Sequence, residues 1–252
     1  MGVAAFLLGT AFGSFANLVI YRVAPPPSAT RAASVCPACG APAAWFERLP
    51  LISYAILLGR CRHCGDRISP RYPLVELIVG AAWAAVALRV RLRPELPAFL
   101  AFATVLVILS VIDLLHHRLP NRILGPAGVV AVILLGSAAA VEGEWGRLAA
   151  GALGAASYGA LMWILVLVAP GQMGAGDAKF AAYLGLHLGW LGAGEVVAGA
   201  LLAFFTGAVT GLLLLIAGRK GWKDFVPFGP FMAAGALIPV LLGDVAAGWV
   251  SF

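Results

Sequence analysis

The sequence predicts an all-α polytopic membrane protein, with about eight transmembrane helices and a small cytoplasmic zinc-binding module between the first two. Hydrophobic residues make up 62% of the 252 residues, charged residues only 11%, and the mean hydropathy is +0.97. Soluble domains carry about 25% charged residues, so this composition excludes them. The chain also contains repeated apolar stretches of about 20 residues, the length that crosses a bilayer as a helix.

Eight apolar stretches supply the expected helices. The first runs straight into Tyr21 and Arg22 with no basic segment before it, so we expect a retained anchor and not a cleaved signal peptide. The sixth is short and contains His187, which we interpret as a helix-packing residue. The expected helices lie near residues 2–21, 73–90, 97–115, 123–141, 148–169, 178–193, 195–217 and 227–250.

The connecting segments predict which side of the membrane each loop faces. With the N-terminus outside, thirteen of the 17 Lys and Arg residues fall in cytoplasmic connections, as the positive-inside rule requires. Only Arg147 and the cluster Arg89, Arg91 and Arg93 fall on the other side. We therefore expect membrane lipid as the surroundings and both termini outside. The basic residues form no stripe with aromatic ones, so we expect no nucleic-acid partner.

Two aspartates, Asp113 and Asp177, lie at the ends of apolar stretches. Carboxylates near the hydrocarbon are costly and usually face a cavity, a partner or a substrate. Two spans separate these residues, so both are expected at the cytoplasmic side. A pair of carboxylates that share a proton can activate water for amide hydrolysis, which indicates an aspartyl protease.

The segment around Asp177 suggests how such a site is built. Gly174 and Gly176 are expected to let the loop backbone approach an extended substrate, and Lys179 favours an anion nearby. We hypothesise that Asp177 is the general base and Asp113 its protonated partner. A plain helix-breaking turn and a solvated carboxylate at the interface remain as alternatives.

All four cysteines of the chain lie in its one substantial soluble segment. They form two Cys-x-x-Cys pairs separated by 21 residues, a pattern typical of a structural Zn²⁺ bound by four thiolates. A redox dithiol is the alternative. Within this segment Leu51–Leu58 is too short to span and is expected to pack under the zinc site or lie at the membrane surface. The expected ligands are Cys36, Cys39, Cys61 and Cys64.

The sequence thus predicts three parts: a first transmembrane helix over 1–21, a cytoplasmic four-cysteine module over 22–72 and a transmembrane peptidase bundle over 73–252. His116 and His117 follow Asp113 closely, but no further ligand cluster completes a metal site, so we interpret them as solvated interfacial residues.

Other catalytic classes lack their residues, because the chain contains no His-Glu-x-x-His and no Gly-x-Ser-x-Gly. Two other function classes stay open. A proton-coupled transporter would use the two aspartates as a relay, and a scaffold would use the zinc module to recruit partners.

Several groups of residues carry a resemblance to one family over nearly the whole chain. These residues are Gly13-Ser14-Phe15-Ala16-Asn17 with Arg22, the two cysteine pairs, Arg71-Tyr72-Pro73-Leu74-Val75-Glu76, Asp113 with Leu119-Pro120-Asn121, Gly174-Ala175-Gly176-Asp177-Ala178-Lys179 and Pro227-Phe228-Gly229-Pro230-Phe231. Through them the chain resembles the bacterial type IV prepilin peptidases, which are leader peptidases and N-methyltransferases of the Gly-x-Gly-Asp aspartyl protease class. Asn121 departs from the aspartate of many relatives.

The resemblance implies a concrete activity. Asp113 and Asp177 would match the catalytic pair that removes a short basic leader from prepilins or type II secretion pseudopilins, at the cytoplasmic face of the bacterial inner membrane. Gly174, Gly176 and Lys179 would support the active-site loop. Apart from the resemblance, Glu76 near the cytoplasmic end of the second span is expected either to contact the positive charge of the leader or to face the membrane interface. The family then methylates the new N-terminal amine with S-adenosylmethionine, an activity associated with the N-terminal region and its cysteine module.

Overall fold

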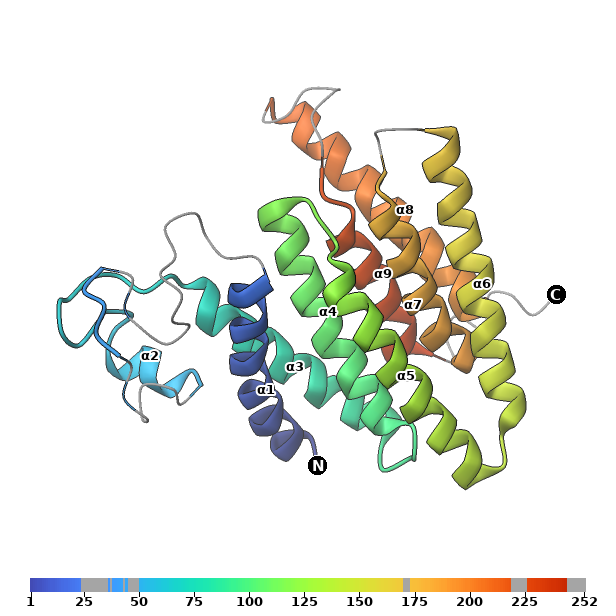
Figure 1. Ribbon diagram of the computed structural model, residues 1–252, viewed down its shortest axis with the longest axis horizontal. Coiled ribbons are helices and arrows are strands. Elements are labelled where there is room, and N and C mark those ends of the chain that lie inside the picture. Colours follow the sequence, from blue (N-terminus) through green and yellow to red (C-terminus); the bar gives the residue numbers. More distant parts are fainter. Residues whose placement is uncertain are drawn as a thin grey trace. The chain divides into compact units, whose positions relative to one another are not determined.

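The computed structural model describes residues 1–23, 36, 38–42, 44, 50–169, 173–218 and 226–243. In this part of the chain every regular element is a helix, which confirms the predicted all-α class (Figure 1). One isolated antiparallel bridge joins Arg60 to Arg67. The helices are α1 (Gly2–Val23), α2 (Ile52–Ile56), α3 (Arg71–Val90), α4 (Leu96–His116), α5 (Asn121–Glu142), α6 (Trp145–Val168), α7 (Ala175–Leu191), α8 (Ala193–Ile216) and α9 (Gly229–Leu242).

Each of the eight expected spans corresponds to a helix. Six of them, α1, α3, α4, α5, α6 and α8, are long and apolar enough to cross a membrane. The other two are shorter, with 17 residues in α7 and 14 in α9. The expected last span reached residue 250, and its end lies outside the described residues. The five-residue α2 is not a ninth span, as predicted.

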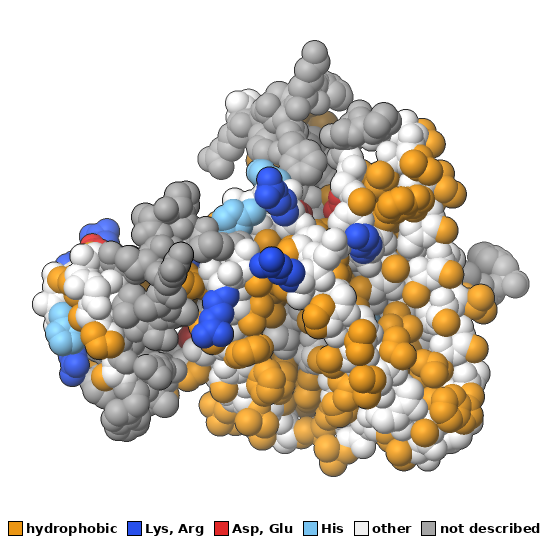
Figure 2. Space-filling view, viewed as in Figure 1, with side chains coloured by type: hydrophobic (Ala, Val, Ile, Leu, Met, Phe, Trp, Pro, Cys, Tyr) orange, Lys and Arg blue, Asp and Glu red, His pale blue; other side chains and the backbone are white. Residues whose placement is uncertain are grey.

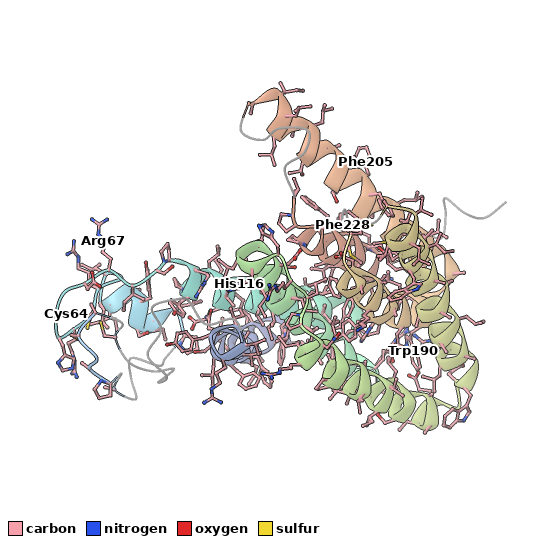
Figure 3. The ribbon with its side chains drawn as sticks, turned by 45° about the horizontal axis from the view of Figure 1, so that its top comes forward. Cys64, Arg67, His116, Trp190, Phe205 and Phe228 are labelled. Carbon is pink, nitrogen blue, oxygen red and sulfur yellow. The ribbon has the colours of Figure 1, made fainter. Side chains whose placement is uncertain are left out.

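Exposed apolar side chains cover the flanks of the long helices. Leu167, Leu201 and Phe205 are each more than 60% exposed, although their side chains are strongly hydrophobic. Figure 2 shows these flanks of the later helices as broad hydrophobic surfaces, and Figure 3 marks Phe205 pointing outward from α8. Apolar surface on this scale requires lipid as the solvent. The chain is therefore a multi-pass membrane protein.

The first compact unit contains residues Met1–Arg91. Its two long helices, α1 and α3, run antiparallel with glycines at the contact: a Cβ on Gly9 would lie 2.8 Å from Trp83, and a Cβ on Gly13 would lie 2.6 Å from the Cα of Glu76. Small residues let membrane helices approach this closely. This unit includes α3, while the three-part division expected from the sequence stays a prediction.

The second unit contains residues Leu92–Phe252, and α7 is its central helix (Figure 1). Glycines bring α6 and α7 into backbone contact, since a Cβ on Gly154 would meet the carbonyl oxygen of Gly185. Most of α7 is buried, which allows this helix to carry polar residues such as Asp177 and His187. Its protein neighbours replace the lipid that a peripheral helix would face.

His187 confirms its interpretation as a packing residue. Its ring is fully buried in α7, stacks on Phe102 with centroids 4.3 Å apart and lies edge-on to Phe99. Its Nδ1 lies 3.0 Å from the carbonyl oxygen of Tyr183. The aromatic cluster therefore joins α4 to α7, the two helices that carry the aspartates.

A cluster of charged residues lies at the start of α4 and the end of α7, the ends of these helices that do not carry the aspartates. The guanidinium of Arg147, at the start of α6, donates to Glu95 at 3.2 Å and to Glu142 at 3.3 Å. It also lies 4.5 Å above the ring of Trp190, near the end of α7. Glu95 precedes α4, so one side chain connects four helix ends. This clamp and the aromatic cluster fix α4 against α7.

Candidate functional site

Asp113 lies one turn before the end of α4 and is only 4% exposed. Its Oδ2 atom accepts the backbone N–H of Gly229 at 2.8 Å. Gly229 begins α9, so the positive end of that helix points at the carboxylate. From the sequence, Asp113 was expected to experience only the negative C-terminal end of its own helix. The tertiary structure adds the positive N-terminal end of α9 as a second influence.

Gly229 is the contact of Asp113 that sequence reasoning missed. It stood within a matched motif, Pro227–Phe231, but was interpreted as the start of a helix. A Cβ on Gly229 would lie 2.7 Å from Oδ2 and 3.1 Å from the Cβ of Asp113. Figure 3 marks Phe228, which directly precedes this glycine and packs its ring near Phe204 and Phe231. Only glycine fits between this aromatic anchor and the carboxylate.

We therefore expect Gly229→Ala to lower peptidase activity by about 10–100-fold. A hydrogen bond to a charged group contributes about 1.5–3 kcal/mol, and the added methyl would push Asp113 away from its donor. The initial rate of leader release from a prepilin substrate measures this effect. Gly136→Ala is the matched control, because Gly136 lies in α5 with nothing within 4 Å of its Cβ position. Equal rates for both variants would contradict the role of Gly229.

Asp177 lies at the N-terminal end of its helix, whereas Asp113 lies near a C-terminal end. It belongs to the first turn of α7 and is 8% exposed. Its Oδ2 accepts the N–H of Gly174 at 2.8 Å, and its own N–H donates to the carbonyl oxygen of Gly174 at 3.0 Å. Gly174 has no side chain, so Asp177 supplies the acidic half of a capping box alone. This local bonding aims the carboxylate inward at the helix start.

The tertiary structure places the two carboxylates within range of electrostatic interaction with each other. In each carboxylate one oxygen accepts a backbone N–H. The donor is Gly229 for Asp113 and Gly174 for Asp177. A carboxylate offers about four acceptor positions, so both retain capacity for a proton or a water molecule. The two environments are more alike than the sequence indicated, and the assignment of base and acid stays a prediction.

Lys179 and Gly176 hold the loop that follows α4. The Nζ atom of Lys179 donates to Oδ1 of Asn121 at 2.9 Å, at the start of α5. A Cβ on Gly176 would lie 3.0 Å from the Cβ of Leu119, so this glycine permits close packing of that loop. Gly174 shows no comparable crowding, and its expected approach to substrate stays a prediction.

The two histidines after Asp113 lie at the end of α4, where Figure 3 marks His116. His117 is exposed and adopts a left-handed conformation, with φ 51°, that closes the helix by donating its N–H to the Asp113 carbonyl at 2.8 Å. Among the described residues neither belongs to a group that could hold a metal. Their exposure agrees with an interfacial position.

The four cysteines converge in the first unit. The ligand atoms of Cys36, Cys39, Cys61 and Cys64 all lie within 4.8 Å of one another. The Sγ atoms of Cys36 and Cys64 are 3.8 Å apart, and those of Cys39 and Cys61 are 3.9 Å apart. A tetrahedron with Zn–S bonds of about 2.3 Å has edges of about 3.8 Å, so the spacing fits zinc. All four are free thiols, and this cluster could hold a metal ion.

Each cysteine pair ends in the same turn. Gly40 and Gly65 directly follow the second cysteine of their pairs and have φ 71° and 73°, which glycine adopts without strain. Their N–H groups donate to the carbonyl oxygens of Cys36 and Cys61. Figure 3 marks Cys64 and Arg67 beside the second turn. The repeated turn aims the sulfur atoms of both pairs at one point.

The thiols of this cluster differ in acidity. Backbone N–H groups of Cys64 and His63 lower the pKa of Cys61 to about 7. For Cys64 the amide of Asp66 acts in the same direction, but burial and the neighbouring thiols outweigh it and raise the pKa to about 12. Four adjacent thiols therefore do not all ionise together, and a bound cation is what would favour the fourfold thiolate.

The short apolar segment lies beside this cluster. In α2, Ile52 and Ile56 are 57% and 74% exposed, and Leu58 is 83% exposed. No residue of α2 is buried, which does not agree with packing under the cysteines. The exposed apolar side chains favour the other predicted position, at the membrane surface.

Comparison with known proteins agrees with these features. Residues 7–90 match the family described as the bacterial peptidase A24 N-terminal domain, and residues 100–216 match the type IV leader peptidase family. Both matches fall on the segments that carry the clustered cysteines and the paired aspartates.

Three relatives share the name prepilin leader peptidase/N-methyltransferase. The protein from Myxococcus xanthus (strain DK1622) is 40% identical over 86% of this chain and 64% of its own length. That from Burkholderia pseudomallei (strain K96243) is 34% identical over 95% of this chain and 84% of its own. That from Bacillus subtilis (strain 168) is 30% identical over 95% and 93%. No solved structure matches the chain.

These matches confirm the resemblance that the motifs indicated. They extend over both units and over nearly the full length of the chain. The chain belongs to the type IV leader peptidase family.

Proposed function

We propose that this chain cleaves the short basic leader from prepilins or type II secretion pseudopilins and then methylates the new N-terminal amine. The observation that carries the proposal is the buried pair Asp113 and Asp177, which lie near the end of α4 and the start of α7, within range of electrostatic interaction. Relatives of this chain bear the name prepilin leader peptidase/N-methyltransferase, which includes both activities.

The two carboxylates would divide the hydrolysis between them. The ionised one takes a proton from water as the water oxygen attacks the scissile carbonyl carbon, and the protonated one donates to the carbonyl oxygen. The C–N bond then breaks and the leaving amine receives the proton held by the base. Backbone donors from Gly174 and Gly229 keep both carboxylates oriented through the cycle.

The substrate would reach the site at the cytoplasmic face of the inner membrane. This placement rests on the excess of basic residues in the connections that share a side with Asp113 and Asp177. Arg118, Arg122 and Lys179 lie close to them in sequence. Figure 2 shows Lys, Arg and His side chains gathered near one end of the later helices, away from the apolar flanks.

Two further groups belong to the proposal. Zn²⁺ would bind Cys36, Cys39, Cys61 and Cys64 and order the first unit, since their sulfur spacing fits a tetrahedral ion. S-adenosylmethionine would supply the methyl group for the second reaction.

A cleavage assay tests the proposal directly. The full chain in detergent or membranes is mixed with a prepilin, and the product mass is measured with and without S-adenosylmethionine. We expect loss of the leader in both cases and one added methyl mass only with the methyl donor. Absence of cleavage across several verified prepilins would reject the proposal and favour the transport alternative, which predicts proton-coupled flux instead.

A further inference from the structure

A second polar cluster lies in the first unit, between α1 and α3. Asn17 and Glu76 are 7% and 9% exposed, although both are strongly polar. The antiparallel packing places Gly13 against Glu76 and bonds Asn17 to Tyr72, one turn further along both helices. The two side chains therefore lie one turn apart on the same helix contact. No residue of this cluster takes part in the proposed hydrolysis.

The hydrogen bonds of this cluster leave one buried acceptor, Oδ1 of Asn17, without a donor. Oε2 of Glu76 accepts the N–H of Leu51 at 2.8 Å. Nδ2 of Asn17 donates to the carbonyl oxygen of Tyr72 at 3.0 Å, but its Oδ1 is buried with no partner. A buried oxygen in this state is costly and indicates a missing donor.

Glu76 also carries a negative charge that no cation of the described residues neutralises. Within the described residues no cation lies within 4.0 Å of it, since the ion pairs found there involve Glu95 and Glu142. Arg71 precedes it on α3, yet the guanidinium of Arg71 lies over the ring of Tyr72 at 5.3 Å. A buried, unpaired carboxylate beside an orphan amide oxygen suits a cation with several N–H donors.

We infer that Glu76 and Asn17 bind a primary ammonium, the α-amino group of the processed pilin, for methyl transfer. This inference rests on the proposed function, because leader cleavage is what produces that amine. The carboxylate accepts one proton from the ammonium. The neutral amine then forms its N–C bond while the S–C bond of the methyl donor breaks, and the donor leaves as a thioether.

A binding experiment tests the inference without relying on methylation. A synthetic peptide with N-terminal phenylalanine, labelled at its C-terminus, is titrated with the full zinc-loaded chain in detergent, and fluorescence anisotropy gives the Kd. We expect Glu76→Gln and Asn17→Leu each to raise the Kd by about tenfold or more, as for a lost charge-assisted bond. The same peptide with an acetylated amine should bind weakly to the native chain and equally weakly to both variants.

Controls separate this result from misfolding and from the other ammonium source. Thr10→Val is the matched α1 variant, because the Thr10 hydroxyl bonds only to the Leu7 carbonyl within the helix, and it should keep the native Kd. Zinc content and thermal unfolding of every variant check the fold. Unchanged peptide binding in both Glu76→Gln and Asn17→Leu would overturn the inference. If these variants then bound S-adenosylmethionine alone more weakly, the site would belong to the ammonium group of the methyl donor. Failure of the native chain to cleave prepilins would instead reject the proposed function.

Discussion

Replacing Asp113 or Asp177 by Asn is expected to lower leader cleavage by about 10²–10⁴-fold, the range that general acid–base groups contribute. Asparagine has nearly the same shape and can still accept the N–H of Gly229 or Gly174, so the helix ends should stay in place. What it cannot do is exchange a proton with water or with the substrate carbonyl. Each variant therefore tests proton transfer by the carboxyl group while leaving the packing of the helix ends unchanged.

The measurement is the initial rate of leader release, followed by product mass with one prepilin at several enzyme concentrations. Glu195→Gln is the matched control, since Glu195 is also a buried carboxylate, 8% exposed, but lies at the start of α8 outside the pair. It should cleave at the native rate. A double variant should lose no more activity than a single one, because the two residues act as a unit. Cleavage at the native rate by either single variant would disprove the paired mechanism.

Replacing Cys61 by Ser is expected to reduce bound zinc from one ion per chain to background. A thiolate ligand contributes directly to a binding free energy of about 10–16 kcal/mol in small zinc modules. Removing it should therefore lower the zinc affinity by more than the roughly 10–100-fold that follows when a hydrogen-bond partner of a metal ligand is removed. Because the described residues of this module bury little apolar surface, residues near α2 should become sensitive to protease at the same time.

Zinc per chain is measured by mass spectrometry of the metal after purification in detergent. His63→Ala is the matched control: His63 lies between Cys61 and Cys64 but is not part of the four-residue cluster, so this variant should keep its zinc. Retention of zinc by Cys61→Ser, or its loss in His63→Ala, would show a different ligand set. Protease resistance of the metal-free chain would show that the module folds without zinc.

Much of the fold was predictable because the bilayer imposes simple rules on sequence. Each span must be apolar for about 20 residues, and seven of the eight expected segments agree with a helix to within a few residues. The lengths of α7 and α9 were less predictable. The burial of α7 by its neighbours removes the need for apolar residues around its whole surface, and this depends on packing.

The candidate sites were predictable to different degrees. The cysteine ligands follow from spacing alone, since each Cys-x-x-Cys turn is local and ends in a glycine with positive φ. The aspartates were found through their unusual position in an apolar chain. Gly229 was missed because its role depends on a contact with Asp113, 116 residues away in sequence. No periodicity or spacing encodes a contact of that range.

The sequence by itself therefore determined the membrane class, the helices, the four cysteines of the candidate metal site and the identity of the two acidic residues. These features follow from composition and local chemistry. Only the tertiary structure decided which backbone amide meets each carboxylate, that Lys179 bonds Asn121, and that Asn17 and Glu76 form a second polar cluster with an unmet acceptor. Those outcomes depend on how helices approach one another, and close approach is set by small residues such as Gly13 and Gly229 acting on distant partners.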